Sequence, residues 1–149
     1  MIKYRTHTCN ELNKSFKDEN VSLSGWINKK RDHGNLLFID LRDNYGITQC
    51  VIEKENSSFS ELEKIPLETV IKISGKVIER EKNSINSEIA TGEIEISIST
   101  FEVLGRTKEL PLPVFSDQEY SEEVRLKYRF LDLRRKKIHK NIILRSKVI

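Results

Sequence analysis

The chain has 149 residues, of which 37% are hydrophobic and 33% are charged, and its formal net charge is +3. This length and composition fit one ordinary globular domain with an appended segment and argue against a disordered chain. No apolar run reaches the about 20 residues of a membrane span, and the N-terminal stretch lacks the apolar core of a signal peptide. Cys9 and Cys50 do not have metal-ligand spacing, so we expect two reduced thiols in a cytoplasmic protein.

Alternating apolar residues predict five short strands in the first two thirds of the chain. A proline ends a short helix predicted between the third and fourth strands. We place this helix at 59–65 and the strands at 21–31, 36–43, 47–52, 69–80 and 93–103. This order predicts an all-β OB-fold, a five-stranded Greek-key barrel that binds oligonucleotides on its strand 2–3 face. An SH3-like five-stranded barrel is the rival interpretation.

Two of these strands carry further signals. In the first strand, one face is predicted to hold Val21, Leu23, Gly25 and Ile27, with Lys29 and Arg31 continuing that line. In the fifth strand, the apolar face moves from residues 94, 96 and 98 to residues 101 and 103, which indicates a bulge.

Phe38 stands on the polar face of the second strand. Leu37, Ile39 and Leu41 point the other way, which leaves Phe38 on the expected outer face of the barrel. An aromatic ring on that face can stack on a base. The alternative is that the linker or the C-terminal helices cover it.

Polar residues near Phe38 favour a single-stranded nucleic acid as the ligand. The stretch 28–34 places cations that include Arg31 at the end of the first strand, where they can contact phosphates or base edges. Gln49 adds an amide to an otherwise apolar strand. Unpaired bases are read by stacking together with such edge contacts. Since residues 1–118 hold 16 basic and 19 acidic side chains, we expect a local patch and not a global positive field.

The C-terminal part differs in character. Pro111 and Pro113 mark an extended linker, and from Ser121, which can cap a helix, the sequence looks helical. The apolar pattern ends without a stop signal, so we expect a larger protein to continue there. The predicted organisation is an OB-fold domain at 1–104, a linker at 105–120 and a helical segment at 121–149, and residues 119–149 together carry a net charge of +6.

The N-terminal region of bacterial-type aspartyl-tRNA synthetases closely resembles three stretches of this chain: LSGWINKKRDHGNLLFIDLRDNYGITQCV, NSEIATGEIEI and SEEVRLKYRFLDLRR. The resemblance runs from about Arg5 to the end and implies a barrel that binds the tRNA anticodon loop, a hinge and the start of a class II catalytic domain. The full-length enzyme would attach aspartate to tRNA-Asp with ATP and Mg²⁺ and would be a homodimer. This chain alone would be a monomer that binds RNA, needs no cofactor and catalyses nothing.

The resemblance also implies roles for single residues. Phe38 matches the aromatic that stacks on the middle anticodon base, a uracil, and Arg31 and Gln49 match residues that hydrogen-bond the first and middle bases. Glu95 matches a carboxylate near the third base, where it can accept from the cytosine N4 amine but would repel a uracil carbonyl. Arg80 matches a basic position that faces the anticodon stem or loop.

Two positions bear on discrimination between tRNA-Asp and tRNA-Asn. His33 resembles members that charge both tRNAs, and Ser84 departs from the asparagine of strict members. Both indicate relaxed reading of the third base, although His33 can also be read as a polar turn residue.

Two other functions stay open. The chain would then be a stand-alone OB-fold protein that binds single strands without sequence preference, or a relative that has exchanged RNA for a protein partner. The hinge-like LKYRFLDLRR argues against the first, and intact Arg31, Phe38 and Gln49 argue against the second.

Overall fold

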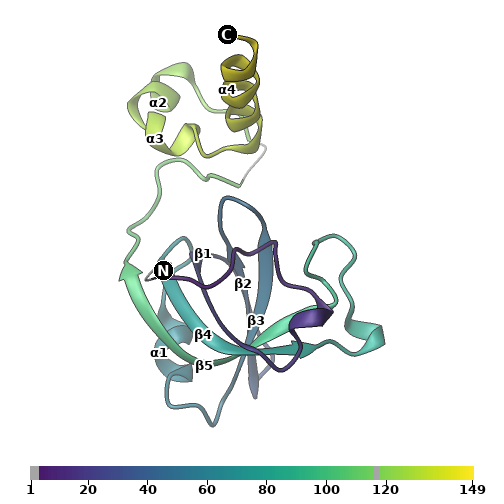
Figure 1. The fold of residues 1–149 in the computed structure, drawn as a ribbon. Coiled ribbons are helices and arrows are strands. Elements are labelled where there is room, and N and C mark those ends of the chain that lie inside the picture. The colour runs from purple at the N-terminus through teal and green to yellow at the C-terminus, as the bar shows by residue number, and fades with distance from the viewer. Residues whose placement is uncertain (1–3, 116–117) are drawn as a thin grey trace. The chain divides into compact units, whose positions relative to one another are not determined.

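The computed structural model describes residues 4–115 and 118–149, and Figure 1 shows its fold. The chain divides into two units, Met1–Thr107 and Lys108–Ile149, which we call the N-terminal and C-terminal units. Within the described residues, none of the helices is both long and apolar enough to cross a membrane.

The N-terminal unit holds the five predicted strands and the predicted helix, each within two residues of its expected bounds. The strands are β1 (Asn20–Asp32), β2 (Leu36–Arg42), β3 (Ile47–Glu53), β4 (Val70–Glu79) and β5 (Ile94–Gly105). The helix is α1 (Phe59–Lys64), and two short 3₁₀ turns are η1 (Lys14–Phe16) and η2 (Lys82–Ser84).

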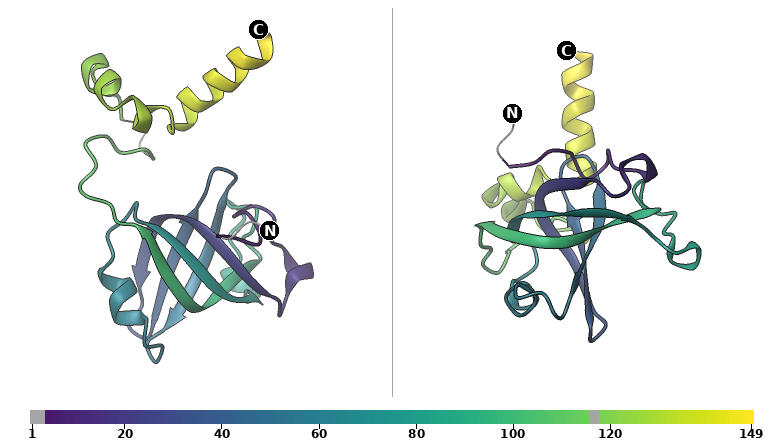
Figure 2. Two further views of the ribbon diagram at one scale, coloured as in Figure 1. Left: turned by 60° about the vertical axis from the view of Figure 1, so that its left-hand side comes forward. Right: turned by 60° about the horizontal axis from the view of Figure 1, so that its bottom comes forward.

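The five strands close on themselves in the order β1-β2-β3-β5-β4. All neighbours are antiparallel except β3 and β5, which run parallel where Cys50 and Val51 meet Ile96 and Ser97. Figures 1 and 2 show α1 at one end of this ring and the loop of residues 81–92 at the other. The OB-fold prediction is confirmed.

Alternate residues of every strand point into one aliphatic core, as the period-2 patterns predicted. Phe59 and Leu62 of α1 close one end of it, and α1 stops where Ile65, which precedes Pro66, turns extended. The fully buried residues of this core include Leu23, Ile27, Ile39, Leu41, Ile71, Ile73, Ile94 and Ile96.

A bulge at Asn28 corrects the predicted pattern of β1. Ile27 pairs with Leu41 but Lys29 pairs with Asp40, so Asn28 is an extra residue and every side chain after it changes face. The prediction that Lys29 and Arg31 continue the core-facing line is therefore wrong. Lys30 continues it.

Lys30 closes the ring beside α1. Its Nζ donates to the backbone oxygens of Glu63 and Ile65, both at 2.6 Å, and so satisfies carbonyls that the end of the helix leaves open. Burial lowers the pKa of this amine, and nearby Glu63 opposes that effect.

The bulge predicted in β5 is confirmed. Gly75 pairs with Ile98 and Ser74 with Thr100, which leaves Ser99 as the extra residue. Phe101 therefore returns to the core side and packs against it. At Gly75 the strands approach so closely that a Cβ atom would lie 2.1 Å from the Ser97 carbonyl oxygen.

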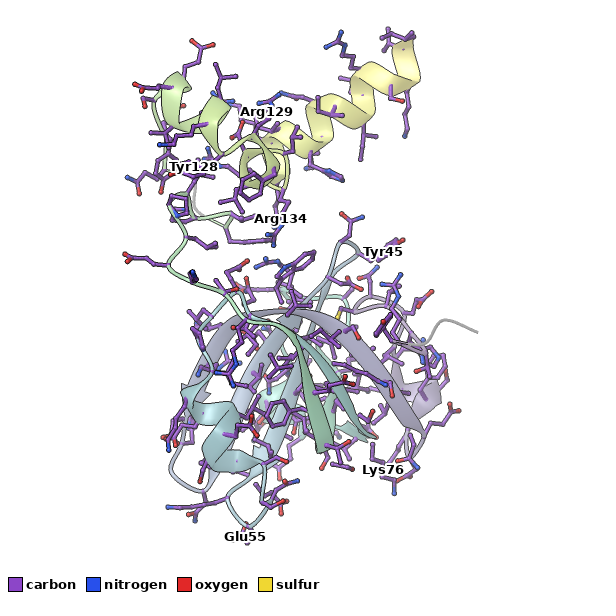
Figure 3. All side chains as sticks on the ribbon, turned by 90° about the vertical axis from the view of Figure 1, so that its left-hand side faces the viewer. Tyr45, Glu55, Lys76, Tyr128, Arg129 and Arg134 are labelled. Atoms are coloured by element: carbon purple, nitrogen blue, oxygen red, sulfur yellow. The ribbon has the colours of Figure 1, made fainter. Side chains whose placement is uncertain are left out.

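Asp43 ties the N-terminal segment to the turn between β2 and β3, from which Tyr45 projects (Figure 3). Its Oδ2 accepts from the backbone N–H of Cys9 at 2.9 Å, and its Oδ1 accepts from those of Tyr45 and Gly46. Cys9 and Cys50 are both buried and unbridged, so the prediction of free thiols is confirmed. Burial raises the pKa of each thiol.

The C-terminal unit contains α2 (Glu122–Lys127), α3 (Arg129–Asp132) and α4 (Lys136–Val148). Ser121 caps α2 as predicted, because its side chain accepts from the backbone N–H of Val124. The small core of the unit holds Leu131 with Leu112 and Val114, which come from the stretch predicted as a linker. The helical segment thus contains three helices. The domain boundaries predicted at residues 104 and 120 remain predictions.

Candidate nucleic-acid interface

The outer face of β1, β2 and β3 gathers the residues that the sequence singled out. Directly opposed residues of paired strands share a face. Arg31 pairs with Phe38, and Asp40 pairs with Gln49, so these four side chains stand on the face opposite the core. Glu95 joins them from β5.

A continuous chain of polar contacts runs across this face. Arg31 Nη2 donates to Asp40 Oδ1 at 2.8 Å and to Gln49 Oε1 at 2.9 Å. Gln49 Nε2 donates to Glu95 Oε2 at 2.8 Å, and the same oxygen lies 3.6 Å from Arg80 Nε. We call these five residues the relay. It alternates donors and acceptors, so each charge has an opposite neighbour.

Phe38 lies beside the relay and is only half-buried, so the core does not enclose it. His33 is exposed in the turn between β1 and β2 and meets the Phe38 ring edge to face, with 5.3 Å between ring centroids. A half-buried ring outside the core, next to fixed donors and acceptors, is the arrangement that stacks on and recognises an unpaired base.

Arg80 differs from the other relay members because its side chain is only 3% exposed. Its Nη1 donates to the backbone oxygen of Ser84 at 3.1 Å, whereas Nε and Nη2 have no hydrogen-bond partner among the described residues. Burial lowers the pKa of this guanidinium, and Glu95 and Asp40 oppose the effect. Arg80 therefore links the 81–92 loop, through the backbone oxygen of Ser84, to the carboxylate of Glu95.

The structure thus brings five predicted site residues into one neighbourhood: Arg31, Phe38, Gln49, Arg80 and Glu95. His33 stands next to Phe38, while Ser84 meets Arg80 through its backbone, and its own side chain is exposed.

Sequence reasoning missed Asp40, although its alternation with Phe38 places it on the same face. The same alternation puts Arg42 outside, yet Arg42 is buried. It forms a two-bond ion pair with Glu68, at 2.7 and 2.9 Å, and has a structural role.

Over residues 4–115 and 118–149, no group of three or more His, Cys, Asp or Glu side chains is placed to hold a metal ion.

Comparison with known proteins agrees with this geometry. Residues 21–104 match the family of OB-fold nucleic acid binding domains. Two curated relatives named aspartate–tRNA(Asp/Asn) ligase align with the whole chain, from Pelagibacter ubique at 73% identity and from Bradyrhizobium diazoefficiens at 54%. The chain spans 25% of the length of each, at the N-terminal end.

A solved structure gives the same result for the fold. Asparaginyl-tRNA synthetase from Pyrococcus horikoshii is 28% identical and superposes with a TM-score of 0.74, over 90% of this chain and 30% of that one.

Proposed function

We propose that this chain, which belongs to the family of OB-fold nucleic acid binding domains, reads the anticodon loop of tRNA-Asp with the outer face of its closed sheet. The observation that carries the proposal is the half-buried Phe38 ring, outside the core and beside the Arg31–Gln49–Glu95 contacts. Stacking supplies affinity for any unpaired base, and the fixed polar groups supply the choice among bases.

Each residue of this face that we propose to contact a base has a role that suits the chemistry of its side chain. Phe38 stacks on the middle base, a uracil, while Arg31 and Gln49 hydrogen-bond the first and middle bases. Glu95 accepts from the N4 amine of a third-position cytosine. Arg80 supports Glu95 rather than touching RNA itself, because its side chain is buried.

The relatives' names support a wider proposal about the parent protein. Both are named aspartate–tRNA(Asp/Asn) ligase. We infer that the parent attaches aspartate to tRNA-Asp and also to tRNA-Asn, with His33 and Ser84 relaxing the reading of the third base. ATP and Mg²⁺ would serve parts of the parent outside this chain, which alone would bind RNA as a monomer without catalysis. The parent would work in the cytoplasm as a homodimer.

The test is a titration of the 149-residue chain with anticodon-arm hairpins at stated salt, since salt sets the phosphate contribution. A hairpin with the anticodon GUC should bind more tightly than one in which the middle uracil is cytosine. Phe38→Ala should weaken GUC binding by about 1–3 kcal/mol, the usual worth of one stacked base. Tyr45→Ala is the matched control, because Tyr45 is an exposed aromatic beyond the opposite end of β2.

Other outcomes identify the rival functions. Equal affinity for GUC and for an unstructured single strand would indicate a stand-alone binder without sequence preference. Binding of neither RNA, or no loss in Phe38→Ala, would contradict the proposed site.

A further inference from the structure

We propose that Asp40 is a positioning residue: it orients Arg31 and, through Arg31, the amide of Gln49, and so sets which base the face accepts. This inference rests on the proposed function. The starting observation is that the carboxylate of Asp40 lies at the centre of the proposed RNA-binding surface, where RNA phosphates and base carbonyls would repel a negative charge.

The placement of Asp40 suits an internal anchor. Its cross-strand partners are Lys29 on β1 and Gln49 on β3, so it lies between the two strands that carry the polar readers. Its side chain is 16% exposed, whereas that of Arg31 is 35% exposed. An incoming base therefore meets Arg31 first, with Asp40 behind it.

Arg31 carries this constraint to Gln49. The Nη2 that donates to Asp40 also donates to Gln49 Oε1, so the amide oxygen must face Arg31. On its other side, Nε2 donates to Glu95. A flipped amide would set its NH₂ against the Arg31 cation and its oxygen against the Glu95 carboxylate, and both contacts would repel.

The fixed amide presents a defined pattern to the ligand. Gln49 keeps one N–H and one oxygen lone pair after its two internal bonds. A uracil edge offers a carbonyl acceptor beside an N–H donor, which is the complement of that pair. A cytosine edge offers an amine and an unprotonated ring nitrogen at the same places. Orientation of the amide, and not its presence alone, selects the middle base.

Removing the charge of Asp40 should reduce the preference for a middle uracil while leaving the overall affinity for RNA nearly unchanged. In Asp40→Asn, Arg31 keeps its positive charge and its attraction to RNA, but loses its ionic partner and turns more freely. We expect affinity for a mismatched hairpin to stay within about threefold of the wild-type value. The preference for a middle uracil over a middle cytosine, expected at about tenfold or more in the wild-type chain, should fall below about threefold.

The experiment titrates the wild-type chain, Asp40→Asn and Asp18→Asn with both hairpins. Asp18→Asn removes the same charge from an exposed ion pair with Lys76, outside the relay, and should keep the wild-type preference. In an Arg31→Ala background, Asp40→Asn should change the preference no further, a result that a merely structural role would not produce. The side-chain amide resonances of Gln49, recorded without RNA, should shift in Asp40→Asn and not in Asp18→Asn.

The outcomes are distinct. An Asp40→Asn chain that keeps the wild-type preference, or that loses equal affinity for both hairpins, would overturn the positioning role while leaving anticodon binding in place. Unmoved Gln49 amide resonances would also overturn it. A wild-type chain that binds neither hairpin would overturn the proposed function and this inference together.

Discussion

Gln49 on β3 donates from Nε2 to Glu95 Oε2 across 2.8 Å, at the one place where two strands of the closed sheet run parallel. This bond joins a proposed reader of the middle base to a proposed reader of the third. Because Glu95 also lies 3.6 Å from Arg80, the carboxylate is held from two sides before any base arrives.

Glu95→Gln should shift third-base preference toward uracil. A carboxylate accepts from the cytosine amine and repels the uracil carbonyl, whereas an amide can donate to that carbonyl. Relative to wild type, we expect the ratio of affinities for hairpins GUU and GUC to rise about tenfold, the usual cost of one mismatched contact. Glu93→Gln, which removes an exposed carboxylate paired with Lys14, is the control and should leave the ratio unchanged. If Glu95→Gln and the wild-type chain show the same ratio, Glu95 does not contact the third base.

The wild-type chain should bind hairpins GUC and GUU within about threefold of each other. His33 beside Phe38 can donate or accept according to its tautomer and therefore tolerates either base. His33→Leu combined with Ser84→Asn should raise the preference for cytosine. Titrations of both hairpins measure this, and a wild-type preference for cytosine above tenfold would reject the relaxed-specificity proposal.

Gly75→Ala should destabilise the N-terminal unit by at least about 2 kcal/mol, because the added Cβ would lie 2.1 Å from a backbone oxygen that cannot rotate away. At Gly105 an added Cβ would have its nearest neighbour 3.9 Å away, on Val70, so Gly105→Ala should change stability by less than about 0.5 kcal/mol. Urea unfolding of the two variants gives the comparison. Equal midpoints would show that β4 and β5 can separate locally without cost.

Glu79 should titrate below its ordinary pKa of 4.5, because hydrogen bonds from Lys14 and then Lys17 favour the carboxylate. A carboxyl group with a lowered folded-state pKa stabilises the protein above the unfolded-state pKa, and the effect disappears as the pH falls through the folded-state value. Carbon-detected NMR titration of Glu79 measures the pKa directly. In Glu79→Gln, stability should fall less between pH 5 and pH 3, about the range of carboxyl titration, and an unchanged acid profile would contradict the assignment.

Strand positions were predictable from this sequence because each strand has one buried face, and a period of two is visible wherever that face is aliphatic. The β5 bulge was predictable for the same reason, since Phe101 breaks the parity of Ile94, Ile96 and Ile98. The Asn28 bulge was not predictable, because the strand is polar from that residue onward. No apolar side chain after the bulge shows which face points to the core.

The residues of the candidate site also fall into those that the sequence pattern predicts and those that it does not. Phe38 stands out in sequence because it is apolar among polar neighbours. Asp40 and the burial of Arg80 do not, since nothing local distinguishes a solvated charge from one held by a partner on another strand. Arg42, on the same alternation as Phe38, is buried on the outer face, where it pairs with Glu68 from a loop 26 residues away in the chain.

The Asn28 bulge makes the register of β1 a determinant of what the protein can recognise. If the same residues formed a regular strand without the bulge, Lys30 and Arg31 would exchange environments: the guanidinium would turn toward the apolar interior, and the helix-capping amine would face solvent. Base recognition would then be lost although every side chain proposed to contact a base is still present in the sequence. Comparisons of related chains should therefore compare the register of this strand as well as the identities of its residues.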